Sequence, residues 1–357
     1  MKQPNLTTLT PEENYRRAVL CEHPEWIPIS FCISDSCWNH YNLDDLQDLM
    51  ESHSLLFPNF KRLSIADRKN GSGMKKGELY TDPWGCVWKT EIEGIVGAVT
   101  SHPLADWSDF KSYLPPNPKE SNGVRNINWE NIGERMARQK MKDGFVEAGL
   151  PHGHTFLRLQ DIRGYENLTF DMADDEPELA ILIKMVEEFN LSLVERYISL
   201  GATFMSYPED LGMQQGPMLS PEHFRKYIKP VYERMMAPAR EAGAFIHMHS
   251  DGDVRTLVDD ILDCGIDAFN LQDLVNGIDW IAENLLGRVC IDLDIDRQEI
   301  TNSGTTAQID ELIHEEIEKL STPSGGLVMT YGLYPGVPLK NVSALMNAME
   351  RYMIKKV

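Results

Sequence analysis

Short apolar or β-branched runs alternate with amphipathic stretches after about residue 150. The runs occupy residues 155–159, 202–207, 244–249, 268–271, 289–293 and 327–330. Helical spacing and capping residues predict helices over 178–200, 220–241, 254–264, 305–320 and 339–355. Strands that alternate with crossover helices form a parallel sheet with both faces covered, so we predict an α/β fold.

The N-terminal part of the chain follows a different pattern. Thr10, Pro11 and Glu13 are typical of a helix N-terminus. A short apolar run at 26–31 predicts a buried strand, and leucines at helical spacing predict a helix within 41–56.

Turn signals and β-rich pieces alternate between about residues 57 and 105. The turns are expected at Asn70-Gly71, Asp82-Pro83 and Gly94, a pattern typical of β-hairpins. One strand near residue 28 and at least six after residue 150 favour eight strands closed into a barrel over an open sheet. We therefore predict a (β/α)8 TIM barrel with an N-terminal helical and β-hairpin excursion. Residues 1–357 would form a single domain, with a hairpin insertion at about 57–120.

Composition excludes some classes of partner. The chain carries 34 Lys and Arg against 55 Asp and Glu, a net charge of -21, so neither nucleic acid nor an anionic membrane is an expected partner. No stretch approaches the roughly 18 to 20 apolar residues of a membrane span, and the first residues do not resemble a signal peptide, so we expect a cytoplasmic protein. The six cysteines have no regular spacing, which argues against a disulfide framework or a zinc ribbon.

The segment His247-Met248-His249-Ser250-Asp251 carries the most informative candidate chemistry. In a TIM barrel the functional residues follow the last residue of each strand. Alternation along a strand places His247 and His249 on the same face. His249 and Asp251 can bind Zn²⁺ through nitrogen and oxygen, or Asp251 can orient His249 as an acid or base. The structural alternative is that His247 is a hydrogen-bonded core residue and that Ser250-Asp251 caps a helix beginning near Asp253.

Other predicted strand ends carry further polar candidates. Glu209 and Asp210 are adjacent carboxylates, followed by Gln214, and their alternative role is solvation of a loop or capping of a helix. Arg158 can hold a substrate carboxylate through two hydrogen bonds, or pair with a nearby acid. Tyr331 follows the last predicted strand.

Several segments in order resemble the uroporphyrinogen decarboxylase superfamily. They are Asp82-Pro83-Trp84-Gly85, 163–168, Glu209-Asp210-Leu211-Gly212 through Ser220-Pro221-Glu222, His249-Ser250-Asp251-Gly252, Gly325-Gly326 and 338–342. The resemblance implies a (β/α)8 barrel over about residues 10 to 355. The superfamily also contains cobalamin-linked methyltransferases.

The porphyrinogen decarboxylases of this superfamily carry an arginine-rich loop after the first strand, which holds the propionates of the substrate. Here the corresponding residues, 30–37, contain no cation. Several buried carboxylates of a tetrapyrrole would therefore stay unpaired, at a cost of several kcal/mol each. The resemblance thus points away from this branch.

The methyltransferase branch binds zinc through a His-x-Cys-Gly motif and a later cysteine. His249 matches the histidine, Asp251 stands in place of the first cysteine, and Tyr331 falls where the later one is expected. Zinc that activates a thiol prefers soft ligands, so this departure argues against a thiol acceptor. A harder site of His249, Asp251 and Glu209 or Asp210 is compatible with the demethylation of a methyl ether.

The leading hypothesis is a methyltransferase that moves a methyl group from a small methylated substrate, such as an aryl methyl ether, to the cobalt of a separate corrinoid protein. The expected catalytic residues are His249, Asp251 and Asp210, and the expected Zn²⁺ ligands are His249, Asp251 and Glu209. The expected substrate-binding residues are Glu209, Gln214, Arg158, His247 and Tyr331. The resemblance also suggests a homodimer. The alternatives are a metal-independent decarboxylase or lyase of the same superfamily and a non-catalytic ligand-binding barrel.

Overall fold

The computed structural model describes residues 9–64, 75–142 and 144–354. It divides into two compact units. Unit 1 comprises Met1–Lys76, Glu91–Val96 and Asn270–Val357, and unit 2 comprises Gly77–Thr90 and Gly97–Phe269. The turn expected at Asn70-Gly71 and the end of the last predicted helix, at residue 355, lie outside the described residues. The single-domain organisation stays a prediction.

Each unit contains helices and strands. The elements of unit 1 are α1 (Pro11–Val19), β1 (Ile29–Ile33), α2 (Cys37–His40), α3 (Leu43–Ser52), α11 (Asp273–Asn276), α12 (Ile278–Leu285), β11 (Cys290–Asp294), α13 (Ile300–Ser303), α14 (Thr306–Leu320), β12 (Leu327–Leu333) and α15 (Leu339–Met353). The elements of unit 2 up to α7 are β2 (Leu79–Thr81), β3 (Val87–Lys89), β4 (Ala98–Ser101), the 3-10 helix η2 (Trp107–Ser112), α4 (Trp129–Lys142), β5 (Glu147–Gly149), α5 (Phe156–Arg163), α6 (Tyr165–Asp174) and α7 (Pro177–Ser199). Those after α7 are β6 (Phe204–Asp210), β7 (Gly212–Met213), β8 (Gly216–Pro217), α8 (Pro221–His223), the π-helix η3 (Phe224–Ile228), α9 (Lys229–Glu241), β9 (Phe245–Asp251) and α10 (Val258–Asp263).

The main sheet has seven strands in the order β1-β12-β11-β10-β9-β6-β5. Strand β10 (Ala268–Gln272) begins in unit 2 and ends in unit 1. The pairs β1–β12, β11–β12, β5–β6 and β6–β9 are all parallel. The predicted α/β fold with a parallel sheet is therefore confirmed. Pairing of the first strand with the last is what a barrel requires, while closure through an eighth strand stays a prediction.

Local capping follows the sequence closely. Thr10 caps α1, because its side-chain oxygen accepts a hydrogen bond from the Glu13 N–H at 3.1 Å. Thr305 and Gln308 form the reciprocal capping box of α14. Among the described residues no helix has both the length and the apolar character needed to cross a membrane.

The strand expected at 155–159 is wrong, because this segment forms the start of helix α5. Its apolar residues Phe156, Leu159 and Ile162 are all buried, at the spacing of one helical face. The Glu209 carboxylate accepts hydrogen bonds from the first N–H groups of this helix. Such capping by a distant residue leaves no local signal, so the short apolar run alone could not separate strand from helix.

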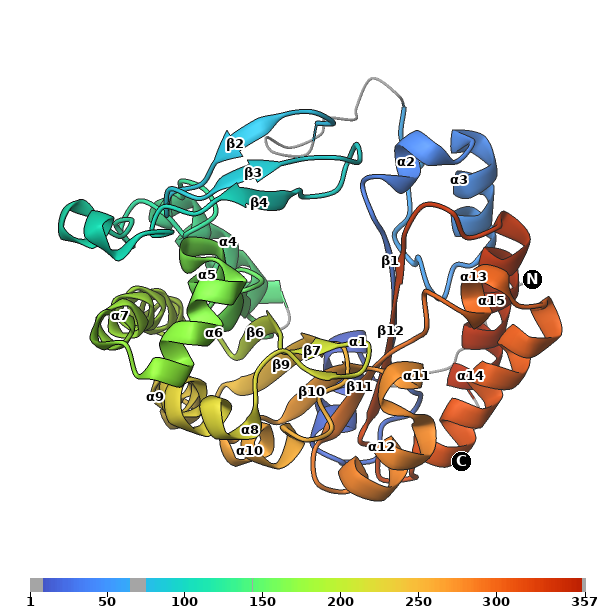
Figure 1. Cartoon of the computed structure of the whole chain (residues 1–357). Coiled ribbons are helices and arrows are strands. Elements are labelled where there is room, and N and C mark those ends of the chain that lie inside the picture. Colours follow the sequence, from blue (N-terminus) through green and yellow to red (C-terminus); the bar gives the residue numbers. More distant parts are fainter. Residues whose placement is uncertain (1–8, 65–74, 143, 355–357) are drawn as a thin grey trace. The chain divides into compact units, whose positions relative to one another are not determined.

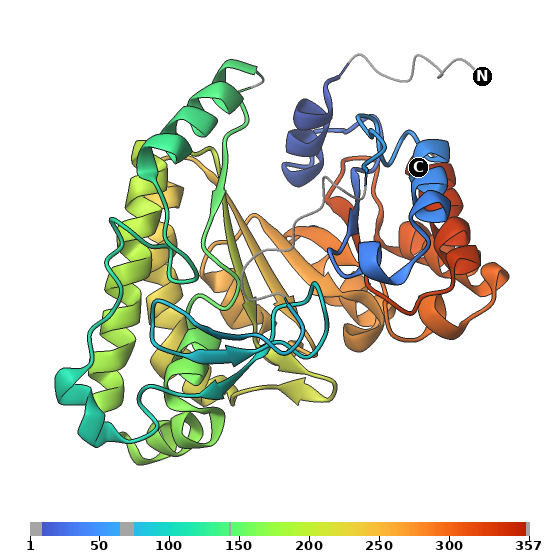
Figure 2. The same ribbon diagram turned by 90° about the horizontal axis from the view of Figure 1, so that it is seen from above.

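The hairpin excursion is confirmed as a three-stranded antiparallel sheet. Strands β2, β3 and β4 lie side by side in both views (Figure 1, Figure 2). Asp82 holds the first turn, since its Oδ1 accepts hydrogen bonds from the Trp84 and Cys86 N–H groups, each at 2.9 Å. Its Oδ2 accepts a hydrogen bond of 2.7 Å from Nη1 of Arg158 on α5. This buried ion pair fastens the hairpin to α5.

Replacement of Arg158 tests the importance of this ion pair. Arg158 also lies 3.6 Å from Asp161 Oδ2, and its side chain is only 5% exposed. Arg158→Met leaves two buried carboxylates without their cation, so we expect a loss of about 3–5 kcal/mol in the free energy of unfolding, measured by urea titration. The control, Arg138→Met, removes a 66% exposed arginine and should change the stability by less than about 0.5 kcal/mol. Equal effects of the two substitutions would contradict the anchoring role.

Unit 1 contains a buried acidic pair. Glu316 on α14 is fully buried, and burial followed by the nearby charge of Asp273 raises its pKa well above the usual range. Burial also raises the pKa of Asp273 to about 6. The folded state therefore holds protons that the unfolded chain has released by about pH 4–5.

This pair predicts that stability falls as the pH rises. Between the unfolded pKa values and the raised folded ones, the folded state binds more protons, so the free energy of unfolding decreases with increasing pH from about pH 4 to beyond 6. Glu316→Gln keeps the neutral, protonated shape, and we expect a shallower decrease and higher stability than wild type at pH 8. Urea titrations at several pH values measure both. A slope unchanged by the substitution would show that the pair does not titrate in this way.

Candidate functional site

Strands β6 and β9 place their last residues side by side. Their parallel register pairs Ser206 with His247, Pro208 with His249 and Asp210 with Asp251. Burial alternates along both strands in the same phase, so that Asp210, His249 and Asp251 share the less buried face. The prediction that His247 and His249 share a face is confirmed.

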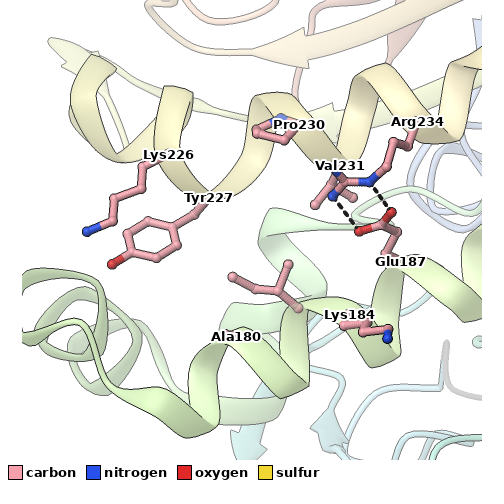
Figure 3. A pocket seen from close by; sticks show the side chains of 9 residues that line it. Ala180, Lys184, Glu187, Lys226, Tyr227, Pro230, Val231 and Arg234 are labelled. Carbon is pink, nitrogen blue, oxygen red and sulfur yellow. Dashed lines mark hydrogen bonds and ion pairs between the residues drawn. The ribbon is translucent and has the colours of Figure 1, made fainter.

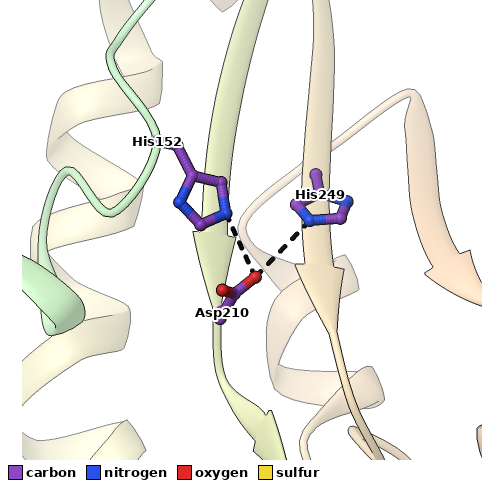
Figure 4. A group of neighbouring side chains, drawn as sticks. All are labelled: His152, Asp210 and His249. Carbon is purple, nitrogen blue, oxygen red and sulfur yellow. Dashed lines mark hydrogen bonds and ion pairs between the residues drawn. The ribbon is translucent and has the colours of Figure 1, made fainter. Parts of the chain in front are cut away.

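A second histidine joins this strand end from the loop after β5. His152 Nε2 lies 3.2 Å from Asp210 Oδ1, and His249 Nε2 lies 3.4 Å from the same oxygen (Figure 4). We call His152, Asp210 and His249 the His–Asp–His cluster. Asp251 borders it, because its N–H donates a hydrogen bond of 3.2 Å to Asp210 Oδ1 and its own Oδ1 lies 3.8 Å from His249 Nε2.

The cluster is charged and accessible. Burial alone would raise the pKa of Asp210, but the hydrogen bonds from His152 and His249 hold it well below its usual range. Burial alone would lower the pKa of His152, but the hydrogen bond and charge of Asp210 outweigh burial and raise it. The side chains of His152, Asp210 and His249 are 51%, 26% and 18% exposed. A negative carboxylate therefore lies between two imidazoles within reach of solvent.

The donor set fits a divalent metal ion. One ligand atom from each residue of the cluster lies within 4.8 Å of the other two. Tetrahedral Zn²⁺ with bonds of about 2.0–2.1 Å needs neighbouring donors about 3.3 Å apart. The two separations at Asp210 Oδ1, 3.2 and 3.4 Å, match that value. Imidazole and carboxylate are both ordinary zinc ligands.

Glu209, expected to be a ligand, lies on the opposite face of β6 from Asp210. Its side chain is fully buried. Its Oε2 accepts hydrogen bonds from the Thr155 and Phe156 N–H groups, both at 2.8 Å, and its Oε1 accepts one from Leu157 at 3.2 Å. Burial raises the pKa of Glu209 to about 7, against the lowering effect of these donors. Strand alternation sends neighbouring residues to opposite faces, so the structure does not bring Glu209 to the cluster.

The other predicted binding residues lie in different surroundings. Gln214 is exposed in the turn between β7 and β8. Arg158 is buried in its ion pair with Asp82 of the hairpin. His247 lies two residues before His249 on β9, with Nδ1 3.4 Å from Ser206 Oγ. Tyr331 belongs to unit 1, where it is buried and donates a hydrogen bond of 3.3 Å to Thr301 Oγ1.

The alternative role of Ser250-Asp251 as a helix cap is wrong. Helix α10 begins only at Val258. Ser250 instead accepts a hydrogen bond from the Leu211 N–H at 2.9 Å, which ties the end of β9 to the residue after Asp210.

The model of the uroporphyrinogen decarboxylase (URO-D) family matches residues 144–352, more than half of the chain. The chain belongs to the URO-D family. The resemblance inferred from the sequence is thereby confirmed, and the chain is an enzyme of the URO-D superfamily. No curated protein matches it.

Solved structures with a similar fold include a methyltransferase from Methanosarcina mazei. That structure is 16% identical, with a TM-score of 0.63, and the match covers 96% of this chain and 99% of the methyltransferase. A B12-independent methionine synthase from a Shewanella species is 9% identical, with a TM-score of 0.40 and coverage of 64% and 66%.

Sequence reasoning missed His152 in this URO-D family chain. Because a strand was expected at 155–159, functional residues were expected after residue 159, and His152 lies before that position. The actual strand β5 has only three residues, and the first of them, Glu147, is exposed. The available signal was Pro151-His152-Gly153-His154, where two imidazoles flank a glycine just after a short strand.

A pocket of about 450 Å³ lies on the helical side of unit 2, between α7 and the η3–α9 segment (Figure 3). Lys184, Lys226 and Tyr227 contribute to its lining, and Glu187 is already hydrogen bonded to Arg234 across it. Neither the His–Asp–His cluster nor any of the predicted site residues lines this pocket. The pocket is therefore separate from the candidate site.

Two glycines hold the loops after β6 and β9 against each other. Gly252 has a φ of +81°, and a Cβ on it would lie 2.1 Å from the carbonyl carbon of Gly212. The Asp253 N–H donates a hydrogen bond of 2.7 Å to Met213 O at the same contact. A side chain at either glycine would push the loops apart, and with them Asp210 and Asp251.

Gly252→Ala tests this contact, with Gly243→Ala as its control. Both glycines have a positive φ, but a Cβ on Gly243 would meet nothing within 4 Å. Gly243→Ala should lower the free energy of unfolding by about 1–2 kcal/mol through the left-handed backbone alone. Gly252→Ala should lower it by about 1–3 kcal/mol more, because the two backbones must separate. Equal losses in urea titrations would show that the close approach is unimportant.

Proposed function

We propose that this chain transfers a methyl group from a small methylated substrate, of the aryl methyl ether class, to the cobalt of a corrinoid held by a separate protein. The observation that carries the proposal is the convergence of His152 and His249 on Asp210 at the ends of parallel strands. The fold shared with a methyltransferase supports it. So does the place of the cluster, since barrel enzymes act at this end of their strands.

In the proposed site, His152, Asp210 and His249 hold Zn²⁺. A bound zinc ion would act as a Lewis acid on the substrate oxygen, whose developing negative charge must be neutralised before the alkoxide or phenoxide can leave. The low pKa of Asp210 keeps its carboxylate ready to bind a cation at neutral pH. The Asp251 N–H orients that carboxylate, and the Asp251 side chain is a further donor on the same face.

The donor set favours an oxygen-bound methyl group over a thiol acceptor. Among the described residues the cluster contains nitrogen and oxygen donors and no cysteine. Four of the six cysteines are buried, and the two exposed ones, Cys21 and Cys32, belong to unit 1. Thiolates make zinc softer and suited to activating thiols, whereas imidazole and carboxylate leave it a harder acid suited to oxygen. The half-exposed His152 also leaves the site accessible to a docking protein.

A metal-independent decarboxylase or lyase is the second candidate. The observation in its favour is that Asp210 accepts hydrogen bonds from both imidazoles, the pairing that orients a histidine as an acid or base. The two candidates differ in their response to chelation. Activity that survives removal of all divalent metal would favour the second.

Metal analysis and substitution test the proposed function. We expect about one zinc per purified chain. His152→Ala and His249→Ala should bind zinc more weakly and release it during purification, because each loses one of its three candidate ligands. Methyl transfer from an aryl methyl ether to a reduced corrinoid protein should fall about 100-fold or more in both variants, because several kcal/mol of charge stabilisation disappear.

His314→Ala is the matched control, since it removes a half-exposed histidine from α14 in unit 1. It should keep both zinc and activity. Full activity in His249→Ala, or a wild-type protein that contains no zinc and turns over no methyl donor, would contradict the proposal.

A further inference from the structure

Glu209 is a fully buried acid that the proposed chemistry does not use. It precedes Asp210 on β6 and projects to the other face of the strand. Its carboxylate accepts hydrogen bonds from three consecutive N–H groups, those of residues 155–157, and a fourth from the Tyr232 hydroxyl at 3.1 Å. Four donors match the roughly four lone-pair sites of a carboxylate, and three of the four come from one short segment. They indicate that this group holds a specific segment.

The segment it holds carries His152. Before His152, the Leu150 N–H donates a hydrogen bond of 3.0 Å to Ser206 O on β6. Just after it, the Gly153 N–H donates one of 3.0 Å to Pro208 O. Residues 155–157 then bind Glu209. The segment 150–157 is therefore attached to β6 at several points along its length, and Glu209 provides the last attachment.

The adjacent carboxylates of β6, Glu209 and Asp210, thus contact different parts of the segment that carries His152. Asp210 meets the His152 imidazole on one face, while Glu209 binds the backbone that follows His152 on the other. Without Glu209 the three N–H groups at the start of α5 would be buried and unsatisfied, and the segment could rearrange to reach other acceptors. His152 enters the cluster from this loop alone, whereas Asp210 and His249 are on paired strands.

We propose that Glu209 is a positioning residue, which holds the segment 150–157 so that His152 reaches the metal site of the proposed function. The predicted effect on zinc affinity rests on the proposed function. The attachment of segment 150–157 to β6 does not, because it is present in the chain without metal.

Glu209→Gln is the informative substitution. The side chain keeps its size, but it can no longer ionise, and it presents an amide N–H where Oε1 or Oε2 now accepts from the backbone. Loss of a residue that orients a metal ligand typically lowers metal affinity 10- to 100-fold. We expect about a 10-fold weaker zinc affinity, because the single oxygen of the new amide cannot replace both carboxylate oxygens.

A double-mutant cycle separates positioning from a general loss of structure. Zinc affinity is measured by competition with a chromophoric chelator for wild type, Glu209→Gln, His152→Ala and the double variant. If Glu209 acts through His152, Glu209→Gln should lower the affinity about 10-fold in wild type and less than about 2-fold in the His152→Ala background. The same factor in both backgrounds, or no change in either, would overturn the proposal.

Glu316→Gln is the matched control, because it makes the same substitution at another fully buried glutamate, in unit 1. Its zinc affinity should stay within about 2-fold of wild type. If Glu209→Gln does not fold, Tyr232→Phe removes one hydrogen bond from Glu209 without changing the carboxylate, and it should give a smaller decrease in the same direction.

Amide hydrogen exchange in zinc-free protein distinguishes this inference from the proposed function. Glu209→Gln should accelerate exchange across residues 150–157 by about 10-fold, and Glu316→Gln should not, because an open segment exchanges in proportion to its population. A wild-type protein that binds no zinc would contradict the metal of the proposed function, while faster exchange would still support the attachment. Unchanged exchange at 150–157 in Glu209→Gln would overturn the positioning role whatever the zinc result.

Discussion

The alternation of side chains along β6 is the constraint on which the candidate site depends. Because of this alternation, the neighbouring acids Glu209 and Asp210 lie in different environments. Glu209 is fully buried, and Asp210 lies at the accessible strand end. Glu209 satisfies the first N–H groups of α5 and thereby fixes the path of the chain between β5 and that helix. The His152 imidazole, which lies on this part of the chain, contacts Asp210. Had both carboxylates pointed the same way, the loop would lack its attachment and a second negative charge would lie beside Asp210 in the cluster.

The chemistry of the cluster follows from its nitrogen and oxygen donors. Two imidazoles and a carboxylate suit a hard, oxygen-directed metal ion, and Asp251 stands where a thiolate is expected from the resemblance to zinc-binding methyltransferases. The URO-D family membership fixes the type of fold but leaves this choice open, because one barrel supports many reactions. The proposed substrate class therefore rests on the donors at the strand ends and not on the family.

Some motif residues that resemble the family serve the scaffold. Asp82 organises the hairpin turn through the Trp84 and Cys86 N–H groups and pairs with Arg158 on α5. Arg158 was a reasonable candidate for substrate binding from its residue type. A guanidinium that is buried against two carboxylates has its charge already compensated, and exposing it to a ligand would leave those carboxylates unpaired.

Local sequence patterns predicted the fold class, the strands of the parallel sheet from β6 onward, the capped helices at Thr10 and Thr305, and the shared face of His247 and His249. These depend on local periodicity and capping, which a single segment contains. Long-range contacts were needed to show that 156–163 is helical and that His152 completes the cluster. Each of these depends on a contact between residues more than 50 positions apart, and such a contact leaves no periodic signal in either segment.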